Sequence, residues 1–375
     1  MKLTELLSGI ETLQRAGAPE TDITSLGFDS RHATAGQLFF AVKGSASDGH
    51  DYMAQATANG AAAVVCERLP EEPFPGVAYI VVADSSAALG TIASRFYGEP
   101  SHKLKLVGVT GTNGKTTTAT LLYDLFRRLG YKAGLISTVV YRIDNETLPS
   151  THTTPDAIRL NAMLAEMAER GCDYCFMEVS SHSIVQERIA GLTFAGGIFT
   201  NITHEHLDYH GTFAEYIRAK KRFFDHLPKG AFALVNTDNR NGAVMVQNSA
   251  ATTYTYALRS FSDFRCRILE NTPEGMLLEL DGQQVWTRFL GRLNAYNLAA
   301  VYGAARLLGA DCDETLQALS TLTPVNGRFD TLHSPDGITA IVDYAHTPDA
   351  LRNVMDTVNE LRSGAGRLIV VVGCG

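Results

Sequence analysis

Buried apolar runs alternate with amphipathic stretches along the middle of the chain. Apolar runs of strand length occur at 104–109, 132–137, 173–179, 195–200 and 231–236. Apolar residues recur at helical spacing over 115–129, 155–170, 212–227, 294–308 and 313–320. This alternation predicts an α/β fold with a mostly parallel sheet and helices on its faces.

Two of the predicted helices carry start signals. Thr154-Pro155-Asp156 offers a capping hydroxyl, a proline at the first helical position and an early acid. Thr212 and Glu215 have the spacing of a capping box. Both signals favour helices that begin close to these residues.

The segments on either side of this alternation differ in character. Residues 1 to about 98 mix short strands with a helix, predicted over 52–59 and followed by a strand at 62–67. Residues 252–290 alternate apolar and polar positions around glycine-containing turns, which predicts hairpins and an antiparallel extension of the sheet. Tyr97-Gly98-Glu99-Pro100 has the composition of a linker.

A third unit is predicted from residue 329. It contains a strand at 339–342, a helix at 348–361 and a strand at 368–372. A βαβ unit this short cannot cover both faces of its sheet, so we expect the sequence to stop inside a domain. The predicted domains are therefore 1–98, 99–328 and an incomplete 329–375.

Composition narrows the class of partner. The net charge of −8 argues against nucleic acid, because no basic stripe is present to neutralise phosphates. No apolar stretch reaches 18 residues and the N-terminus lacks a signal-peptide core, which predicts a cytoplasmic protein without a membrane partner. Cys172 and Cys175 form one isolated pair, for which buried thiols are favoured over metal or redox chemistry.

The string TGTNGKTT at 110–117 lies between a predicted strand and a predicted helix. Glycines let backbone N–H groups close on phosphate oxygens, and the helix N-terminus adds a favourable dipole. Lys115 would reach the β- and γ-phosphates of ATP, and the Thr116 hydroxyl would reach Mg²⁺. The match to GxxxxGK[ST] is imperfect, since Val109 stands where the first glycine belongs. The strand–loop–helix context still favours ATP binding over a turn without ligand.

Hard oxygen ligands for Mg²⁺ are expected at the same sheet edge. Glu178 ends a predicted strand, where parallel sheets bind their ligands, and a metal role is favoured over a solvent-exposed acid. The segment at 200–211, TNITHEHLDYHG, leaves three readings: a polar loop, a histidine that joins Glu178 around Mg²⁺, or a zinc site that lacks HExxH. Lys220 follows on the next helix, where a surface lysine is the ordinary alternative.

A second polar cluster, SSHS at 180–183 with Gln186 and Arg188, lies after the strand that ends in Glu178. Such a cluster suits an anionic or amide-bearing substrate. A Ser-His hydrolase is the competing idea, but no G-x-S-x-G elbow is present.

Taken together, these motifs resemble the Mur ligases, ATP-dependent amide-bond formers of peptidoglycan synthesis. The strings that carry the resemblance are DSR at 29–31, TGTNGKTTT at 110–118, TTPD at 153–156, MEVSSH at 177–182, TNITHEHLDYHG at 200–211, NAYNLAA at 294–300, NGRF at 326–329 and DYAHTPDAL at 343–351. They span almost the whole chain in family order. The HLDYHG and DYAHTPDAL strings are similar to the branch that adds the third residue, a diamino acid.

The resemblance implies roles for individual residues. The catalytic residues would be Lys115, Lys220 and His206. The metal ligands would be Thr116, Glu178, His206 and Lys220. Lys220 would act as a carbamate that holds a second Mg²⁺. ATP would be bound by Gly111, Thr112, Asn113, Gly114, Lys115, Thr116, Thr117, Asn297, Arg328, Asp343 and His346. The muramoyl-dipeptide nucleotide would be bound by Ser30, Thr153, Thr154, Ser180, Gln186 and Arg188.

The implied fold has three domains: a UDP-binding domain, a central P-loop ATPase-type domain and an incomplete Rossmann-like domain. The implied reaction joins meso-diaminopimelate or L-lysine to the D-glutamate of UDP-N-acetylmuramoyl-L-alanyl-D-glutamate through an acyl phosphate. ATP and two Mg²⁺ would be needed, and a monomer is expected. The alternatives are a related ligase of the folylpolyglutamate synthase kind and a nucleotide-binding fragment without activity.

Overall fold

The computed structural model describes residues 1–17, 20–44, 47–335, 338–362 and 366–373. The chain divides into two compact units, and the path of the chain passes between them several times. The first unit consists of Met1–Leu104, Thr154–Glu169 and His182–Thr193, and the second of Lys105–Thr153, Arg170–Ser181 and Phe194–Gly375.

The first unit is built on a five-stranded sheet. Its strand order is β1 (Gln14–Ala16), β5 (Ala78–Val81), β4 (Ala63–Cys66), β3 (Gln37–Phe40) and β2 (Ser25–Gly27). β1 is antiparallel to β5, and the other pairs are parallel. Both faces are buried: Phe40 and Val65 belong to one apolar cluster, and Phe39 and Val64 to another. Alternate side chains of a strand point to opposite faces, so two cores are expected from one sheet.

The helices of this unit are α1 (Leu3–Leu6), η1 (Ser30–His32), η2 (Gly49–Tyr52), α2 (Met53–Ala58), α3 (Ser85–Phe96), η3 (Pro100–His102) and α5 (Ala157–Glu169). α1, α3 and α5 contribute side chains to one core, and α2 contributes to the other. The helix predicted over 52–59 and the strand predicted over 62–67 are confirmed as α2 and β4. α5 comes from a distant part of the sequence, and its Ala157 packs in the same core as Leu89 of α3.

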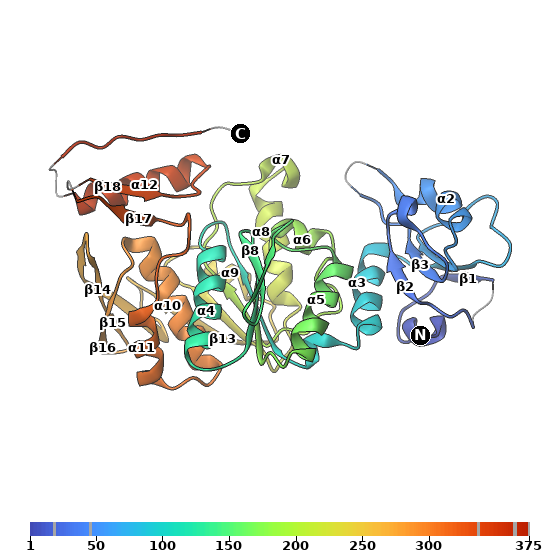
Figure 1. Cartoon of the computed structure of the whole chain (residues 1–375), viewed down its shortest axis with the longest axis horizontal. Helices are drawn as coiled ribbons and strands as arrows, with labels where there is room; N and C mark the ends of the chain where they lie inside the picture. Colours follow the sequence, from blue (N-terminus) through green and yellow to red (C-terminus); the bar gives the residue numbers. More distant parts are fainter. Residues whose placement is uncertain (18–19, 45–46, 336–337, 363–365, 374–375) are drawn as a thin grey trace. The chain divides into compact units, whose positions relative to one another are not determined.

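The second unit contains an eleven-stranded sheet of order β16-β15-β14-β13-β12-β11-β6-β10-β7-β8-β9. Figure 1 labels β8 and β13 to β16 of this sheet. Its strands are β6 (Lys105–Thr110), β7 (Ala133–Ile136), β8 (Val140–Ile143), β9 (Glu146–Pro149), β10 (Tyr174–Glu178), β11 (Gly196–Phe199), β12 (Phe232–Asn236), β13 (Thr252–Ala257), β14 (Phe264–Thr272), β15 (Gly275–Leu280) and β16 (Gln283–Thr287). β7, β10, β6, β11, β12 and β13 are mutually parallel where they pair. The parallel sheet predicted from the five apolar runs is confirmed.

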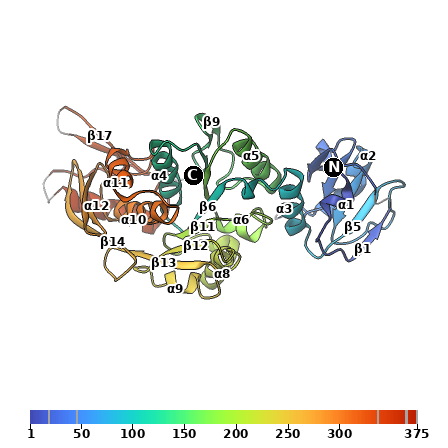
Figure 2. The same ribbon diagram turned by 90° about the horizontal axis from the view of Figure 1, so that it is seen from below.

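The helices that lie wholly or partly in this unit are α4 (Lys115–Arg128), α6 (Ser181–Val185), α7 (Leu207–His210), α8 (Phe213–Asp225), α9 (Gly242–Met245), α10 (Arg292–Leu307) and α11 (Cys312–Thr321). α6 begins in the second unit and continues into the first. Figure 2 shows α4, α10 and α11 on one side of the central strands and α8 and α9 on the other. α4 and α10 share one apolar core with β6, β12 and the hairpin strands.

The predicted helix starts have different outcomes. The Thr212 hydroxyl accepts a hydrogen bond from the Glu215 N–H at 3.2 Å and caps α8, as expected. The helix predicted from residue 155 begins instead at Ala157, because the Asp156 carboxylate accepts from the Arg159 N–H at 3.0 Å. An acid two residues after the threonine therefore takes the capping role.

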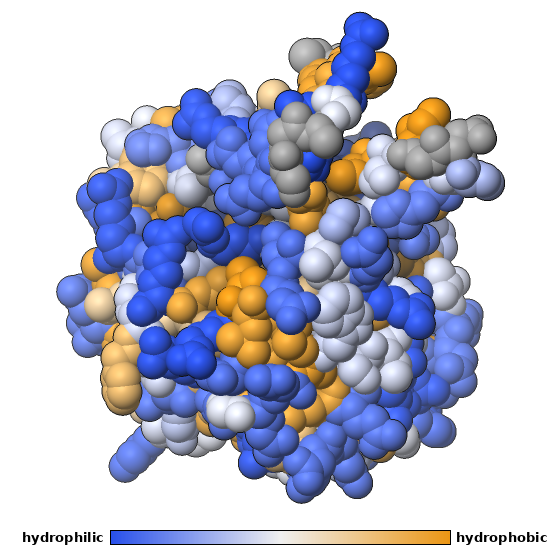
Figure 3. Space-filling view, turned by 90° about the vertical axis from the view of Figure 1, so that its left-hand side faces the viewer, coloured by the Kyte–Doolittle hydropathy of each residue, from blue (hydrophilic) through white to orange (hydrophobic). Residues whose placement is uncertain are grey.

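The prediction of hairpins over 252–290 was wrong at its start. β13 pairs with β12 in parallel, and β14 begins with a short parallel pairing to β13. Only β14, β15 and β16 form the predicted antiparallel extension. Figure 3 views the end of the unit that carries these strands and shows a patch of hydrophobic residues surrounded by hydrophilic ones.

The segment from residue 329 holds an antiparallel pair, β17 (Asp330–His333) and β18 (Thr339–Val342), followed by α12 (Pro348–Leu361). The strand predicted over 368–372 is absent from the described residues. Those residues find no neighbouring strand to pair with, and Val371 is 93% exposed. The predicted βαβ unit was therefore wrong, although its strand at 339–342 and its helix are confirmed. Within the part of the chain that the structure describes, no helix is long and apolar enough to cross a membrane.

Candidate active site

The loop between β6 and α4 has the shape that a phosphate requires. Gly111 has φ +151°, and a Cβ there would lie 2.0 Å from Thr200 Oγ1. Gly114 has φ +87°, and a Cβ there would lie 2.4 Å from Asn297 Oδ1. Only glycine fits either position. The Thr118 N–H makes the first hydrogen bond within α4, to Gly114 O. The N–H groups before it therefore point out of the helix N-terminus, where anions bind.

The chain after β11 holds this loop in place. Asn201 accepts from the Thr112 N–H through its backbone oxygen at 2.8 Å and from the Asn113 N–H through Oδ1 at 3.0 Å. Asn201 Nδ2 and Thr200 Oγ1 both donate to Asn113 O, at 3.0 and 2.6 Å. These four hydrogen bonds hold the loop in this conformation.

Two lysines meet at one backbone oxygen of the loop. Lys115 Nζ donates to Gly111 O at 3.0 Å, and Lys220 Nζ from α8 donates to the same oxygen at 2.8 Å. Burial lowers the pKa of Lys220 well below its ordinary value, and the charge of Lys115 lowers it further. Burial also lowers the pKa of Lys115. Lys220 is 1% exposed and is no surface lysine, so its amine is held close to the loop and biased toward its neutral form.

Glu178 occupies the end of β10, beside β6 in the parallel sheet. It is 1% exposed, and its Oε1 accepts from the Thr138 N–H at 2.6 Å. Thr138 Oγ1 lies 3.2 Å from Glu178 Oε2 and 3.0 Å from Thr153 Oγ1. Thr138 therefore links the predicted metal ligand to a predicted substrate residue of the same unit.

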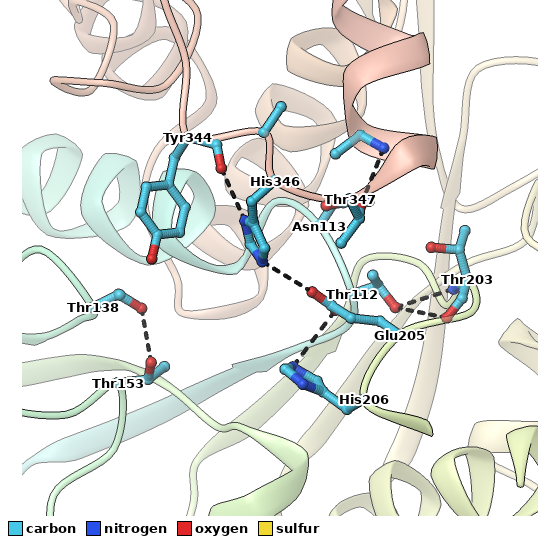
Figure 4. Close-up of polar contacts among 12 residues, drawn as sticks. Thr112, Asn113, Thr138, Thr153, Thr203, Glu205, His206, Tyr344, His346 and Thr347 are labelled. Atoms are coloured by element: carbon cyan, nitrogen blue, oxygen red, sulfur yellow. Dashed lines mark hydrogen bonds and ion pairs between the residues drawn. The ribbon is translucent and has the colours of Figure 1, made fainter. Parts of the chain in front are cut away.

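Glu205 lies between two predicted site histidines, as Figure 4 shows. Its Oε1 is 3.5 Å from His346 Nε2, and its Oε2 is 3.8 Å from His206 Nε2. His206 has φ +55°, a strained conformation for a residue other than glycine. Burial lowers the pKa of His206 and the Glu205 charge opposes this, so the imidazole favours its neutral form, which can bind a metal.

The remaining predicted ATP contacts come from α10 and the last segment. Arg328 Nη2 donates to Thr116 Oγ1 at 3.1 Å, and the guanidinium lies 4.5 Å from the centre of the Tyr344 ring. Asn297 Oδ1 is 3.5 Å from Thr118 Oγ1 on α4. Asp343 accepts from the Phe329 and Ala345 N–H groups. These bonds give each side chain a fixed direction.

The predicted substrate residues fall in both units. Within the first unit, Arg188 donates to Gln186 Oε1 through Nε and Nη2 at 3.0 and 2.6 Å, and to Thr154 O at 2.7 Å. Also in that unit, Ser30 is 6% exposed and donates to Gln55 Oε1 at 2.7 Å. Thr153 and Ser180 belong to the second unit.

The donor set suits a nucleotide with Mg²⁺ better than a zinc ion. Thr116 and Glu178 supply hard oxygens, which Mg²⁺ prefers. His204 stacks on Phe213 and His210 contacts Ser181, so the histidines of 200–211 have separate partners. Across the described residues, no three His, Cys, Asp or Glu side chains are arranged to hold a metal. Cys172 and Cys175 are buried free thiols, as expected.

Three residues of this region were not predicted from the sequence: Thr138, Asn201 and Glu205. Glu205 sits inside the histidine segment, and its place next to His206 was the one available signal. Asn201 lies in the same segment, but its partners belong to the phosphate loop, which is distant in sequence. Thr138 acts through its N–H and its hydroxyl on Glu178, and no local pattern marks it.

Comparisons with known proteins follow the same order along the chain. Residues 22–97 match the Mur ligase family catalytic domain, 109–305 the Mur ligase middle domain and 327–375 the Mur ligase glutamate ligase domain. The chain is 56% identical over 375 residues to UDP-N-acetylmuramoyl-L-alanyl-D-glutamate--2,6-diaminopimelate ligase of Bacteroides thetaiotaomicron, covering 100% of this chain and 78% of the relative. It is 40% identical over 389 residues to the enzyme of that name from Geobacillus thermodenitrificans, with 100% and 78% covered.

Solved structures give a consistent result. A structure of UDP-N-acetylmuramoyl-L-alanyl-D-glutamate--2,6-diaminopimelate ligase aligns with a TM-score of 0.82 and 28% identity, covering 96% of this chain and 74% of that one. Folylpolyglutamate synthase of Mycobacterium tuberculosis aligns with a TM-score of 0.58 and 16% identity, covering 72% and 70%. At that identity the second likeness concerns the fold alone.

Proposed function

The chain belongs to the Mur ligase family, and from this premise we propose that it joins 2,6-diaminopimelate to the D-glutamate of UDP-N-acetylmuramoyl-L-alanyl-D-glutamate with ATP. The observation that carries the proposal is the 56% identity over all 375 residues to relatives with that named activity. The phosphate loop and the buried lysines supply a site suited to this chemistry.

The reaction would proceed in two steps. A γ-carboxylate oxygen of D-glutamate attacks the γ-phosphorus of ATP, the bond to the β-phosphate oxygen breaks, and ADP leaves. The amine of the diamino acid then attacks the acyl carbon, loses a proton, and phosphate leaves as the amide forms. The carboxylate and the triphosphate are both anions, so Lys115 and the α4 N-terminus would hold the phosphates and reduce their repulsion.

Bound Mg²⁺ would add positive charge where the γ-phosphate reacts. Thr116, Glu178 and His206 are the proposed ligands, with Glu178 oriented by Thr138 and His206 by Glu205. A second ion is part of the proposal and requires Lys220 as an oxygen ligand. Only a neutral amine can add CO₂, which forms the N–C bond and releases a proton. Burial and the neighbouring Lys115 favour that neutral amine.

The remaining assignments complete the proposal. Gly111 to Thr117, Asn297, Arg328, Asp343 and His346 would contact ATP, and Ser30, Thr153, Thr154, Ser180, Gln186 and Arg188 the muramoyl nucleotide. The division into domains 1–98, 99–328 and 329–375 and a cytoplasmic monomer also stay proposals. Arg188 would act through its fixed position against Gln186 and Thr154.

The test measures ADP release with UDP-N-acetylmuramoyl-L-alanyl-D-glutamate and an amine acceptor. We expect turnover with meso-diaminopimelate, weaker or no turnover with L-lysine, and none with a folate. Lys115→Ala should abolish turnover and keep the thermal midpoint of the unliganded protein. Turnover with L-lysine or with a folate in preference to diaminopimelate would refute the substrate assignment.

A further inference from the structure

A cavity in the second unit lies outside the candidate ATP site. Its volume is about 610 Å³, and its walls come from the chain after β11, the start of α8, the chain after β12 and the start of α12. None of the residues that we assign to ATP or to Mg²⁺ lines it. The cavity adjoins the phosphate loop through Thr203, a lining residue whose N–H donates to Thr112 Oγ1 at 3.0 Å.

Positive charge dominates the cavity wall. Arg240 and Arg352 both line it, and neither forms an ion pair with a described residue of the chain. The third charged lining residue, Asp238, is already engaged. It accepts from the N–H groups of Leu258, Arg259 and Ser260 at 2.8 to 2.9 Å and from Tyr296 Oη at 2.7 Å.

These four hydrogen bonds occupy the Asp238 carboxylate, so it does not pair with Arg240 or Arg352. Burial alone would raise the pKa of Asp238, but the hydrogen bonds outweigh it and hold that pKa well below its usual range. Asp238 therefore holds the loop at 258–260. Among the described side chains, no other acid on the cavity wall competes with a ligand for the two guanidinium groups.

The rest of the wall offers an aromatic surface and a helix N-terminus, which suit a small anionic ligand with an apolar part. His204 stacks on Phe213 with ring centroids 4.2 Å apart and planes at 19°, which makes a flat wall. α12 is 14 residues long and begins at Pro348 on the cavity wall, so the positive end of its dipole lies there. The dipole adds to the field of Arg240 and Arg352.

We propose that this cavity binds a small ligand through an oxyanion, a carboxylate or a phosphate, with Arg240 and Arg352 as the two guanidinium contacts. The two sources of such an anion are a carboxylate of the incoming diamino acid and a phosphate group. The first source rests on the proposed function, and the second does not.

The experiment is equilibrium binding to the full chain without ATP, by calorimetry, with meso-diaminopimelate, L-lysine and inorganic phosphate as separate probes. Arg240→Gln and Arg352→Gln remove one guanidinium each, and Arg288→Gln is the control, because Arg288 is exposed and does not line the cavity. We expect each cavity variant to weaken binding about tenfold, as a lost charge-assisted hydrogen bond does, and the control to leave it unchanged.

Each outcome decides the proposal. Weakened binding of diaminopimelate supports the site with the amino acid as its source, and weakened binding of phosphate alone supports it with phosphate as its source. The proposal is overturned if no probe binds, or if the double variant binds every probe as tightly as the unaltered chain. The ADP-release assay tests the proposed function independently of this site. If phosphate binds through Arg240 and Arg352 but the chain shows no ligase turnover, the proposed function is refuted and the binding site is supported.

Discussion

Replacement of Gly111 by alanine tests the loop geometry most directly. Gly111 has φ +151°, and the added Cβ would lie 2.0 Å from Thr200 Oγ1, 2.9 Å from Asn201 O and 3.1 Å from Asn201 N. The variant must therefore accept an unfavourable backbone conformation and also displace the chain after β11. That chain holds Thr112 and Asn113 in place, so the loop would lose its shape together with its support.

The magnitude can be separated into two parts with a matched control. Gly130, just after α4, has φ +89° and nothing within 4 Å of an added Cβ, so Gly130→Ala measures backbone strain alone, about 1 to 2 kcal/mol. Gly111→Ala adds an overpacking cost of about 1 to 3 kcal/mol. We expect a loss of unfolding free energy of about 2 to 5 kcal/mol for Gly111→Ala.

The assay combines urea unfolding with calorimetric binding of ATP. Gly111→Ala should lose ATP binding, whereas Gly130→Ala should bind ATP as the unaltered chain does. Thr200→Ala removes the hydroxyl that the new Cβ would meet, so the double variant should lose less stability than the two single losses predict. Equal stability of Gly111→Ala and Gly130→Ala, with ATP binding intact in both, would refute the reasoning.

Three further predictions concern single side chains. Lys220→Met should stabilise the second unit at pH 7, because burial lowers the folded-state pKa of Lys220 and the unfolded chain therefore binds one more proton. The unfolding free energy of the unaltered chain then rises with pH, and the advantage of the variant shrinks by at most about 1.4 kcal/mol per pH unit. Urea unfolding from pH 7 to 9 measures this change, and a constant advantage would contradict it. Thr212→Ala should lose about 1 kcal/mol of unfolding free energy with the α8 cap, and Thr212→Ser should retain it; equal losses would rule out the hydroxyl as the cause. Asp238→Ala leaves three N–H groups without their acceptor and should lose at least about 2 kcal/mol, with faster hydrogen exchange at 258–260; unchanged exchange there would count against this role.

Much of the central sheet could be predicted because its strands are short apolar runs between helical patterns. The phosphate loop was also predictable, because its residues are contiguous in sequence and the spacing of its glycines and Lys115 is typical of phosphate-binding loops. β13 was misassigned because a strand paired in parallel and a hairpin strand can share the same alternation of apolar and polar residues. Only the neighbouring strand decides between them.

The candidate site was less predictable where partners are far apart in sequence. Lys220 and Lys115 share one acceptor, Gly111 O, although 105 positions separate the two lysines. Helical spacing places Lys220 on the buried face of α8 with Tyr216 and Phe223, but it does not show which backbone oxygen the amine meets. Thr138 and Glu205 are similar cases, because their partners Glu178 and His346 are distant in sequence and are brought close only by the fold.

The composition of the first unit has a consequence for synthesis of the protein on the ribosome. Residues 1–104 emerge first, but the core that contains Leu89 and Ile92 also contains Ala157, from a helix that ends at Glu169. The nascent N-terminal segment must therefore wait for more than 60 further residues before its apolar surface is covered. During that interval it is exposed to solvent and to chaperones, and a stop or pause before residue 169 would leave an incomplete core rather than a small finished domain.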